Sequence, residues 1–316
     1  MEHFNGYCSS RRRFSLAEYA SELTRSGQKT VHGERGTVWV RTETFAMIRF
    51  PVFELTPPSW QELRQVLWSG PAAVATYLLQ PDEKHRANAY LYVCRDNSYA
   101  LEKLPSAARR NIRRGLRELN ITLLSTEQLL NHGYQPYRDW LQRSGLQSQT
   151  KDDFRRHFIA RANCAAHVFF GAWKDGHLAS FLSVTELDKW ADIDGCFSAD
   201  ALLSYRPNDA LFFYVLSRFL SRRGCRAVTY GISSLQAVSN RDGLHAFKIK
   251  VGFEALPVHR AFAFHPLVRP FANRFALRGI NIALRLRPGD RRLKKAEGVL
   301  AYMRGEDRLP KSEHVS

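Results

Sequence analysis

The stretch from residue 205 to residue 253 constrains the fold most, because it reads as helix, strand, turn and short helix. Asn208 and Asp209 are expected to cap the first helix, since their short side chains accept hydrogen bonds from unpaired N–H groups. Apolar residues then recur at helical spacing, and Gly224 is expected to end the helix. A short strand follows at 227–230. A helix N-terminus beside a sheet attracts anions, so this order predicts a phosphate site.

Three stretches of this segment are similar to one enzyme superfamily. They are YRPNDAL at 205–211, the strand between Gly224 and Gly231, and LHAFKIKVGF at 244–253, which is the most specific. A looser match is LPSAARRNIRRG at 104–115. The segment resembles the C-terminal half of Gcn5-related N-acetyltransferases, in particular the branch with the peptidoglycan FemAB-type aminoacyltransferases and the BioF2-like acetyltransferase domains. The resemblance covers roughly residues 100–265.

The resemblance implies an α/β (α+β) fold in which helices flank a mixed, mostly antiparallel central sheet. Whether the N-terminal half is a second, degenerate acyltransferase-like half, which would make two tandem halves, is left open by the sequence. We expect an N-terminal α/β subdomain at 1–125, an acyltransferase domain at 126–265 and a basic helical extension at 266–316. Local patterns predict one long helix at 209–223. They also predict strands at 72–79, 89–94, 167–173, 178–185, 190–197 and 258–264. The Asp-Gly pair at 175–176 suits a tight hairpin turn.

The resemblance also implies that the donor is acetyl-CoA or another acyl-CoA, or an aminoacyl-tRNA. The helix start is expected to hold the donor phosphates, through Arg206, Asn208, Asp209 and Ala210. The glycine-rich pyrophosphate loop of the superfamily is missing here, and Asp209 is an awkward neighbour for phosphate, so a plain helix cap is the alternative. Ser233 and Ser234 follow the next strand and are further candidates for substrate contact.

Catalytic candidates follow from the same motifs. Lys248 lies in the most family-like stretch, where an ammonium could stabilise an oxyanion or hold a donor phosphate; a solvated lysine is the alternative. Asp192 and Asp194 alternate on one strand and should share a face, with Asp194 preferred as the base for the attacking amine. An arginine-paired acid is the alternative reading. Tyr205 could protonate a leaving thiolate or simply pack in a loop, and Lys250 is expected to face solvent.

The charge balance points to polyanionic partners. The chain has 47 Lys and Arg against 30 Asp and Glu, a net charge of +17. Arg109, Arg113 and Arg117 repeat at helical spacing and predict a basic face for RNA or another phosphate backbone, although an ordinary solvated helix face is also possible. The segment 266–296 combines arginines with large apolar residues, which suits weak attachment to an anionic membrane or packing on the sheet.

Several classes of protein are not favoured. No apolar run approaches the length of a membrane span, and the first residues lack the apolar core of a secretory signal, so a cytoplasmic location is expected, with peripheral attachment to the inner face of the membrane as an extension. The five cysteines are scattered, and neither they nor the histidines have metal-ligand spacing, so no metal is expected. No phosphate-loop, dinucleotide or nucleophile-elbow motif occurs.

The sequence therefore predicts an acyltransferase that moves an acyl or aminoacyl group from acyl-CoA or aminoacyl-tRNA to an amine. By analogy alone, the amine would belong to a cell-envelope or polysaccharide precursor. The alternative is a non-catalytic module with a degenerate acyltransferase fold that binds RNA or an anionic membrane through its arginines.

Overall fold

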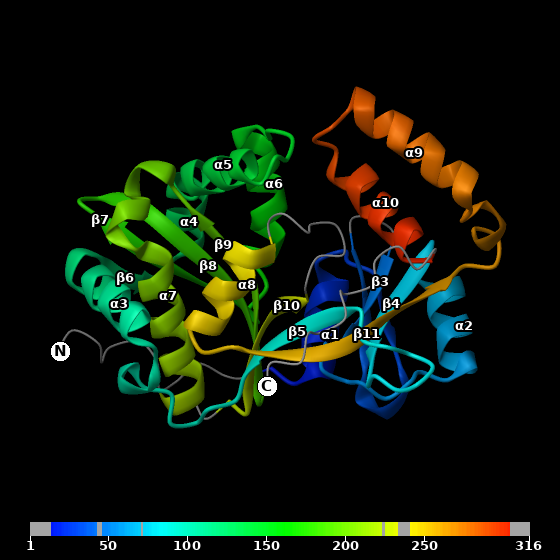
Figure 1. Ribbon diagram of the computed structural model, residues 1–316, viewed down its shortest axis with the longest axis horizontal. Helices are drawn as coiled ribbons and strands as arrows, with labels where there is room; N and C mark the ends of the chain where they lie inside the picture. Colours follow the sequence, from blue (N-terminus) through cyan, green and yellow to red (C-terminus); the bar gives the residue numbers. More distant parts are fainter. Residues whose placement is uncertain (1–13, 43–45, 71, 223–224, 233–240, 304–316) are drawn as a thin grey trace.

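The computed structural model describes residues 14–42, 46–70, 72–222, 225–232 and 241–303. Its centre is a sheet of eleven strands in the order β1-β2-β3-β4-β11-β5-β10-β9-β8-β7-β6 (Figure 1). The strands are β1 (Thr30–His32), β2 (Val38–Arg41), β3 (Ala46–Phe50), β4 (Val74–Leu79), β5 (Ala89–Cys94), β6 (Asn120–Leu123), β7 (His167–Lys174), β8 (His177–Leu187), β9 (Trp190–Ser198), β10 (Ala227–Ile232) and β11 (Glu254–Phe264).

Helices cover both faces of this sheet (Figure 1). They are α1 (Leu16–Arg25), α2 (Trp60–Ser69), α3 (Ser106–Glu118), α4 (Thr126–His132), α5 (Tyr134–Arg143), α6 (Lys151–Ala162), α7 (Pro207–Leu216), α8 (Arg241–Lys250), α9 (Arg274–Leu286) and α10 (Arg291–Met303). The α/β fold with a mixed, mostly antiparallel sheet agrees with the prediction.

The sheet contains the same arrangement twice. In the first unit β1, β2 and β3 are antiparallel, α2 follows, and β4 lies parallel to β3. In the second unit β7, β8 and β9 are antiparallel, α7 follows, and β10 lies parallel to β9. Strand β11 joins the units, because it pairs with β4 along one half and with β5 along the other. This repetition is what two tandem halves predict; the boundary at residue 125 stays a prediction, since the sheet is continuous.

Local sequence explains several of these elements. Asp175 and Gly176 both have positive φ, 48° and 79°, in the turn between β7 and β8, as the hairpin pattern predicted. Ser15 and Ser59 accept hydrogen bonds from the first turns of α1 and α2. The predicted strands are all present, although β4 and β5 do not pair with each other, because β11 lies between them.

The predicted caps of α7 are wrong. The helix begins at Pro207, and Arg206 stands at the N-cap with a left-handed φ of 62° and no side-chain cap. Proline favours the first helical position because its φ is already helical and it lacks an N–H that would need a partner. Asn208 and Asp209 are therefore inside the first turn, which frees their side chains for other contacts. The α-helix also ends earlier than predicted, since residues Ser217–Arg222 form a π-helix.

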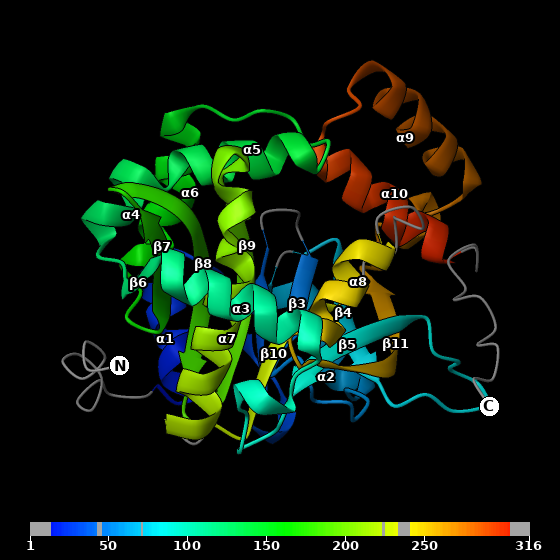
Figure 2. The ribbon, with the colours of Figure 1, turned by 60° about the vertical axis from the view of Figure 1, so that its left-hand side comes forward.

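Alternate residues of β5 show how the layers form. Tyr92 and Cys94 face the cluster beneath α3 and α7, whereas Leu91 and Val93 face the cluster beneath α1. The helices α4, α5 and α6 pack over the end of the second unit through an aromatic core that includes Phe158. Figure 2 shows α3 and α7 side by side in front of the sheet.

A glycine allows α3 and α7 to approach closely. A Cβ on Gly115 would lie 2.7 Å from the Cβ of Ala210 and 2.8 Å from the carbonyl oxygen of Arg206. The start of α7 is thus held directly against α3.

Because of this contact, replacing glycine by alanine should have opposite effects on stability at Gly115 and at Gly279. Gly115→Ala should lower the free energy of unfolding by about 1–3 kcal/mol, since the methyl group overfills the contact. Gly279→Ala, in α9, meets nothing within 4 Å and should raise stability by up to about 1 kcal/mol through helix propensity. Urea unfolding of both variants checks this, and equal shifts in the two would contradict the packing described.

Candidate functional site

The strands β9 and β10 pair over only three residues and then part. The parallel ladder ends where Asp192 lies beside Thr229, and β10 continues against β5. Next to this point β9 carries a bulge, because Val184 pairs with Ile193 and Ser183 pairs with Gly195. Asp194 is thus the extra residue of the bulge, with no residue opposite it in the β8 ladder. We call this region the divergence point.

Lys248, on α8, reaches the divergence point and is 5% exposed. Its Nζ donates a hydrogen bond to the carbonyl oxygen of Tyr230, at 2.9 Å, just beyond the end of the β9–β10 ladder. The same atom lies 3.9 Å from the ring centre of Tyr92 and 4.2 Å from that of Tyr230. Burial lowers the pKa of Lys248 to about 7, against the opposing attraction of Asp192.

Asp192, which interacts electrostatically with Lys248, forms a pair of interacting carboxyl groups with Asp194. Burial, and then the charge of Asp194, raise the pKa of Asp192 well above its usual range, although Thr229 donates a 2.5 Å hydrogen bond to it. Burial would also raise the pKa of Asp194, but hydrogen bonding and charge from His167, together with Arg161, outweigh it and the pKa falls. Because each carboxylate opposes ionisation of the other, the pair holds a proton closer to neutral pH than a lone aspartate does.

The second aspartate is the more accessible of the two. The side chain of Asp194 is 19% exposed, and its carboxylate accepts hydrogen bonds from Ser183, at 3.2 Å, and Thr185, at 3.0 Å. The arrangement couples an ammonium whose pKa is near neutrality to Asp192, whose pKa is raised toward the same range. Such a site can stabilise a developing negative charge and accept a proton from a nucleophile.

The start of α7 lies under α3 and is fixed by its own first-turn side chains. The Asn208 side chain accepts a hydrogen bond from Ser180, at 2.8 Å, instead of capping the helix. Asp209 is buried and forms an ion pair with Lys250 at 2.6 Å, which offsets its negative charge near the helix start. The expectation that Lys250 faces solvent is therefore wrong. Arg206 is exposed, and Ala210 is buried against α3.

The remaining predicted residues lie elsewhere or are not described. Tyr205 is half-buried with the Nζ of Lys174 5.1 Å from its ring centre, and the contacts found for it do not include Lys248 or either aspartate. Ser233 and Ser234 lie outside the described residues. Sequence reasoning missed Tyr92 and Tyr230 as neighbours of Lys248, because no spacing along the chain links β5, β10 and α8.

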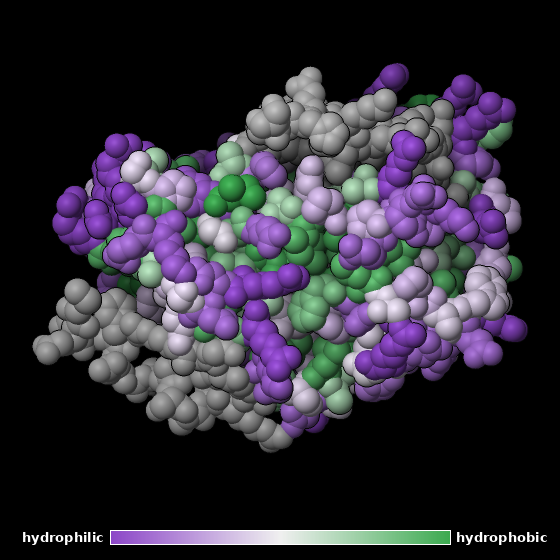
Figure 3. Space-filling model, turned by 60° about the horizontal axis from the view of Figure 1, so that its bottom comes forward, coloured by the Kyte–Doolittle hydropathy of each residue, from purple (hydrophilic) through white to green (hydrophobic). Residues whose placement is uncertain are grey.

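The basic face of α3 is present next to α7. Arg110, Arg113, Arg114 and Arg117 are exposed, and arginines line a surface hollow of about 490 Å³ along this helix. Arg109 instead turns back, since its guanidinium donates hydrogen bonds to the carbonyl oxygens of Glu102 and Leu104. Figure 3 shows hydrophilic side chains spread over much of this face of the molecule, its left-hand end included.

Within the described ranges, no three His, Cys, Asp or Glu residues are grouped so that they could hold a metal ion. Among the same residues, no helix is long and apolar enough to cross a membrane.

Comparison with solved structures identifies the fold. The chain is similar to the C-terminal DUF2156 domain of a putative lysylphosphatidylglycerol synthetase from Agrobacterium fabrum, with 17% identity, a TM-score of 0.52 and coverage of 78% of this chain and 92% of that one. It is similar to FemX with 10% identity, a TM-score of 0.55 and coverage of 81% and 93%. A conserved protein of unknown function from Bacteroides thetaiotaomicron has 11% identity, a TM-score of 0.50 and coverage of 79% and 90%.

No family model and no curated protein matches the chain. At these identities the similarities show the fold alone: the chain shares the fold of FemX and of the DUF2156 domain, in agreement with the fold that the sequence predicted.

The lowered pKa of Lys248 predicts a pH-dependent stability. A lysine whose pKa falls on folding holds its proton in the unfolded chain but loses it in the folded one from about pH 7 upward, so its contribution to stability rises with pH there. We expect the melting temperature of the wild type, relative to Lys248→Met, to rise from pH 7 to about pH 9.5 and to be flat below about pH 6.

The exposed Lys189 supplies the control for the loss of one lysine charge, and the pH dependence of the Lys248→Met difference should exceed that of Lys189→Met. A flat difference for Lys248→Met would mean that folding leaves the pKa of Lys248 unchanged.

Proposed function

We propose that the protein transfers an acyl or aminoacyl group from an activated ester or thioester to an amine at the divergence point of β9 and β10. The observation that carries this proposal is the buried Lys248, whose pKa is lowered to about 7 and which interacts electrostatically with Asp192, itself coupled to Asp194. Burying a lysine costs free energy of folding, so a buried lysine that interacts with a carboxyl group favours a chemical role.

In the reaction, the amine nitrogen attacks the donor carbonyl carbon, and negative charge develops on the carbonyl oxygen. The protonated Lys248 donates a hydrogen bond to this oxygen and so stabilises the developing charge. As the C–N bond forms, the amine loses a proton to the aspartate pair, which the amine meets first at the more exposed Asp194. The C–S or C–O bond of the donor then breaks, and the leaving group takes the proton that the aspartate pair accepted, which restores the pair to its starting state.

The donor is a polyanion held at the start of α7. The first turn of this helix has no side-chain cap, and Lys250 offsets the charge of Asp209, so the helix end can attract phosphate together with Arg206. The arginines of α3 continue the positive surface from there, because Gly115 brings α3 against the same turn. Acyl-CoA and aminoacyl-tRNA both fit this description. Roles for Tyr205 as proton donor and for Ser233 and Ser234 in substrate contact stay predictions.

The alternative function is binding of RNA without catalysis, which the exposed arginines of α3 favour. The acceptor amine of a cell-envelope or polysaccharide precursor remains an analogy with the family. Incubation of the purified protein with labelled acetyl-CoA or aminoacyl-tRNA and a panel of amines separates the two functions, because only an enzyme produces a labelled amide.

Substitution of Lys248 should reduce transfer. Lys248→Met keeps the length of the side chain but removes its hydrogen-bond donor, and we expect turnover to fall by at least about tenfold, the equivalent of roughly 1.4 kcal/mol of transition-state stabilisation. Lys189→Met should leave turnover unchanged. Wild-type turnover in a folded Lys248→Met protein would remove this residue from the reaction.

Neutralising α3 should weaken donor binding. In the triple variant Arg110→Gln, Arg113→Gln and Arg114→Gln, KM for the donor should rise with little change in kcat, since these exposed residues contact phosphates and not the reacting atoms. The slope of the logarithm of the donor binding constant against the logarithm of the salt concentration should also become shallower, by about one unit per lost phosphate contact. Arg155→Gln, on the exposed side of α6, is the matched control. An unchanged KM in the triple variant would exclude α3 from donor binding.

A further inference from the structure

The helix α9 presents an apolar stripe to solvent. Phe275, Ile282 and Leu286 lie on one side of it, with exposed fractions of 66%, 60% and 80%, and Phe271, just before the helix, is 71% exposed. The opposite side, at Leu277, is buried. In Figures 1 and 2 α10 lies between α9 and the rest of the molecule, so the stripe faces outward. Four large apolar side chains with this exposure exceed the scattered single residues of an ordinary surface.

The charged residues next to this stripe in the sequence are all arginines. Residues 255–289 contain six arginines and no Asp or Glu. Arg274, Arg278 and Arg285 of α9 are all exposed, and the guanidinium of Arg274 lies 5.6 Å from the ring centre of Phe275. An apolar stripe with flanking arginines is the pattern of a helix that lies in a membrane interface, where the cations reach lipid headgroups.

A second element at the same end of the molecule has a similar surface. On α2, Trp60 and Trp68 are 70% and 55% exposed, with the exposed Arg64 between them. The ring of Trp68 packs on His265, at 4.5 Å between ring centres, and so joins α2 to the segment that leads into α9. Figure 1 shows both helices at the right-hand end, away from α3. Tryptophan favours the boundary between water and lipid, because its ring is apolar and its N–H is polar.

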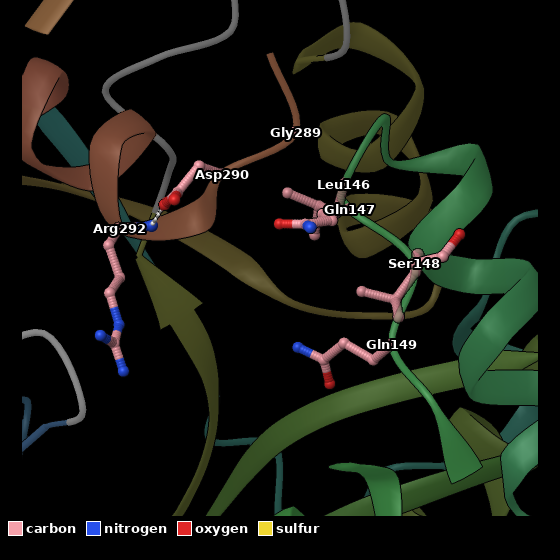
Figure 4. Close-up of a pocket in the computed structure, with 8 residues that line it drawn as sticks. Leu146, Gln147, Ser148, Gln149, Gly289, Asp290 and Arg292 are labelled. Atoms are coloured by element: carbon pink, nitrogen blue, oxygen red, sulfur yellow. Dashed lines mark hydrogen bonds between the residues drawn. The ribbon is translucent and has the colours of Figure 1, made fainter. Parts of the chain in front are cut away.

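The hairpin of α9 and α10 is anchored to the body of the protein. At its turn, the backbone N–H of Gln147 donates to the carbonyl oxygen of Gly289, at 3.0 Å, and Lys294 donates to the carbonyl oxygen of Gly145, at 2.8 Å. Figure 4 shows this junction, where the loop with Gln147 faces Gly289 and Asp290 across a pocket of about 240 Å³. The stripe is therefore presented in a fixed orientation.

We propose that α9, with α2 beside it, attaches the protein to an anionic phospholipid surface. A second copy of the chain is the other candidate for covering the stripe. It fits less well, because a symmetric contact between two stripes would bring the arginines of both copies together with no acid from residues 255–289 to offset them. Anionic headgroups supply that opposite charge. This proposal does not depend on the proposed function, although it would place acyl transfer near lipid-linked amines.

Vesicle co-sedimentation of the full chain tests the proposal. We expect the protein to pellet with vesicles of phosphatidylcholine and phosphatidylglycerol (3:1) in 50 mM salt and to be released by 500 mM salt. It should not pellet with vesicles of pure phosphatidylcholine. The double variant Phe275→Ser and Ile282→Ser should bind at least tenfold more weakly. So should the triple variant Arg274→Gln, Arg278→Gln and Arg285→Gln. These side chains are exposed, so the variants should keep the wild-type melting temperature.

Ile159→Ser, at an exposed apolar position on α6, is the matched control and should bind as the wild type does. Tryptophan emission of the wild type should shift to the blue with anionic vesicles, and less so in Trp60→Phe/Trp68→Phe. Equal vesicle binding by wild type and the double variant would overturn the proposal. So would a dimer in sedimentation velocity that this variant dissociates, since the stripe would then be an interface between copies.

Discussion

The hydrogen bond from Lys248 to the carbonyl oxygen of Tyr230 is the contact on which the rest of the site depends. It exists because β9 and β10 stop pairing after Thr229 and Asp192, which leaves a strand carbonyl available to a side chain. Asp192, at the end of this ladder, interacts electrostatically with the ammonium of Lys248 and with the carboxylate of Asp194. A site with protons exchanging near neutral pH thus follows from the end of one short ladder, in which strand geometry and the cost of burying charge act together.

The sequence predicted the elements that depend on local patterns. Turn chemistry at Asp175 located the hairpin, and the motif around Lys248 pointed to the residue that the structure buries. Local patterns did not predict pairing between distant parts of the chain. Strand β11 lies between β4 and β5, and the ion pair of Asp209 with Lys250 joins α7 to α8. The capping prediction for Asn208 was wrong because the helix begins at Pro207 and the Asn208 side chain accepts a hydrogen bond from Ser180 instead.

Two surfaces give the molecule opposite ends. The arginines of α3 lie against the start of α7, where a phosphate-bearing donor would enter, whereas α9 and α2 carry apolar residues at the other end (Figure 1). Both surfaces account for part of the net charge of +17. On α3, arginines surround a polar hollow, whereas on α9 they flank an exposed apolar stripe. A soluble polyanion suits the first and a lipid surface suits the second.

The central claim is that the acyl carbonyl reacts at the divergence point, and a crystal structure with an unreactive donor tests it most directly. Suitable analogues are a CoA thioether and a 3′-amide-linked aminoacyl adenosine, which mimic the two donor classes. The account predicts that one of them binds with its phosphate or ribose end at the start of α7 and its acyl group within hydrogen-bonding distance of the Nζ of Lys248. An analogue bound with its acyl group away from β9 and β10 would contradict it.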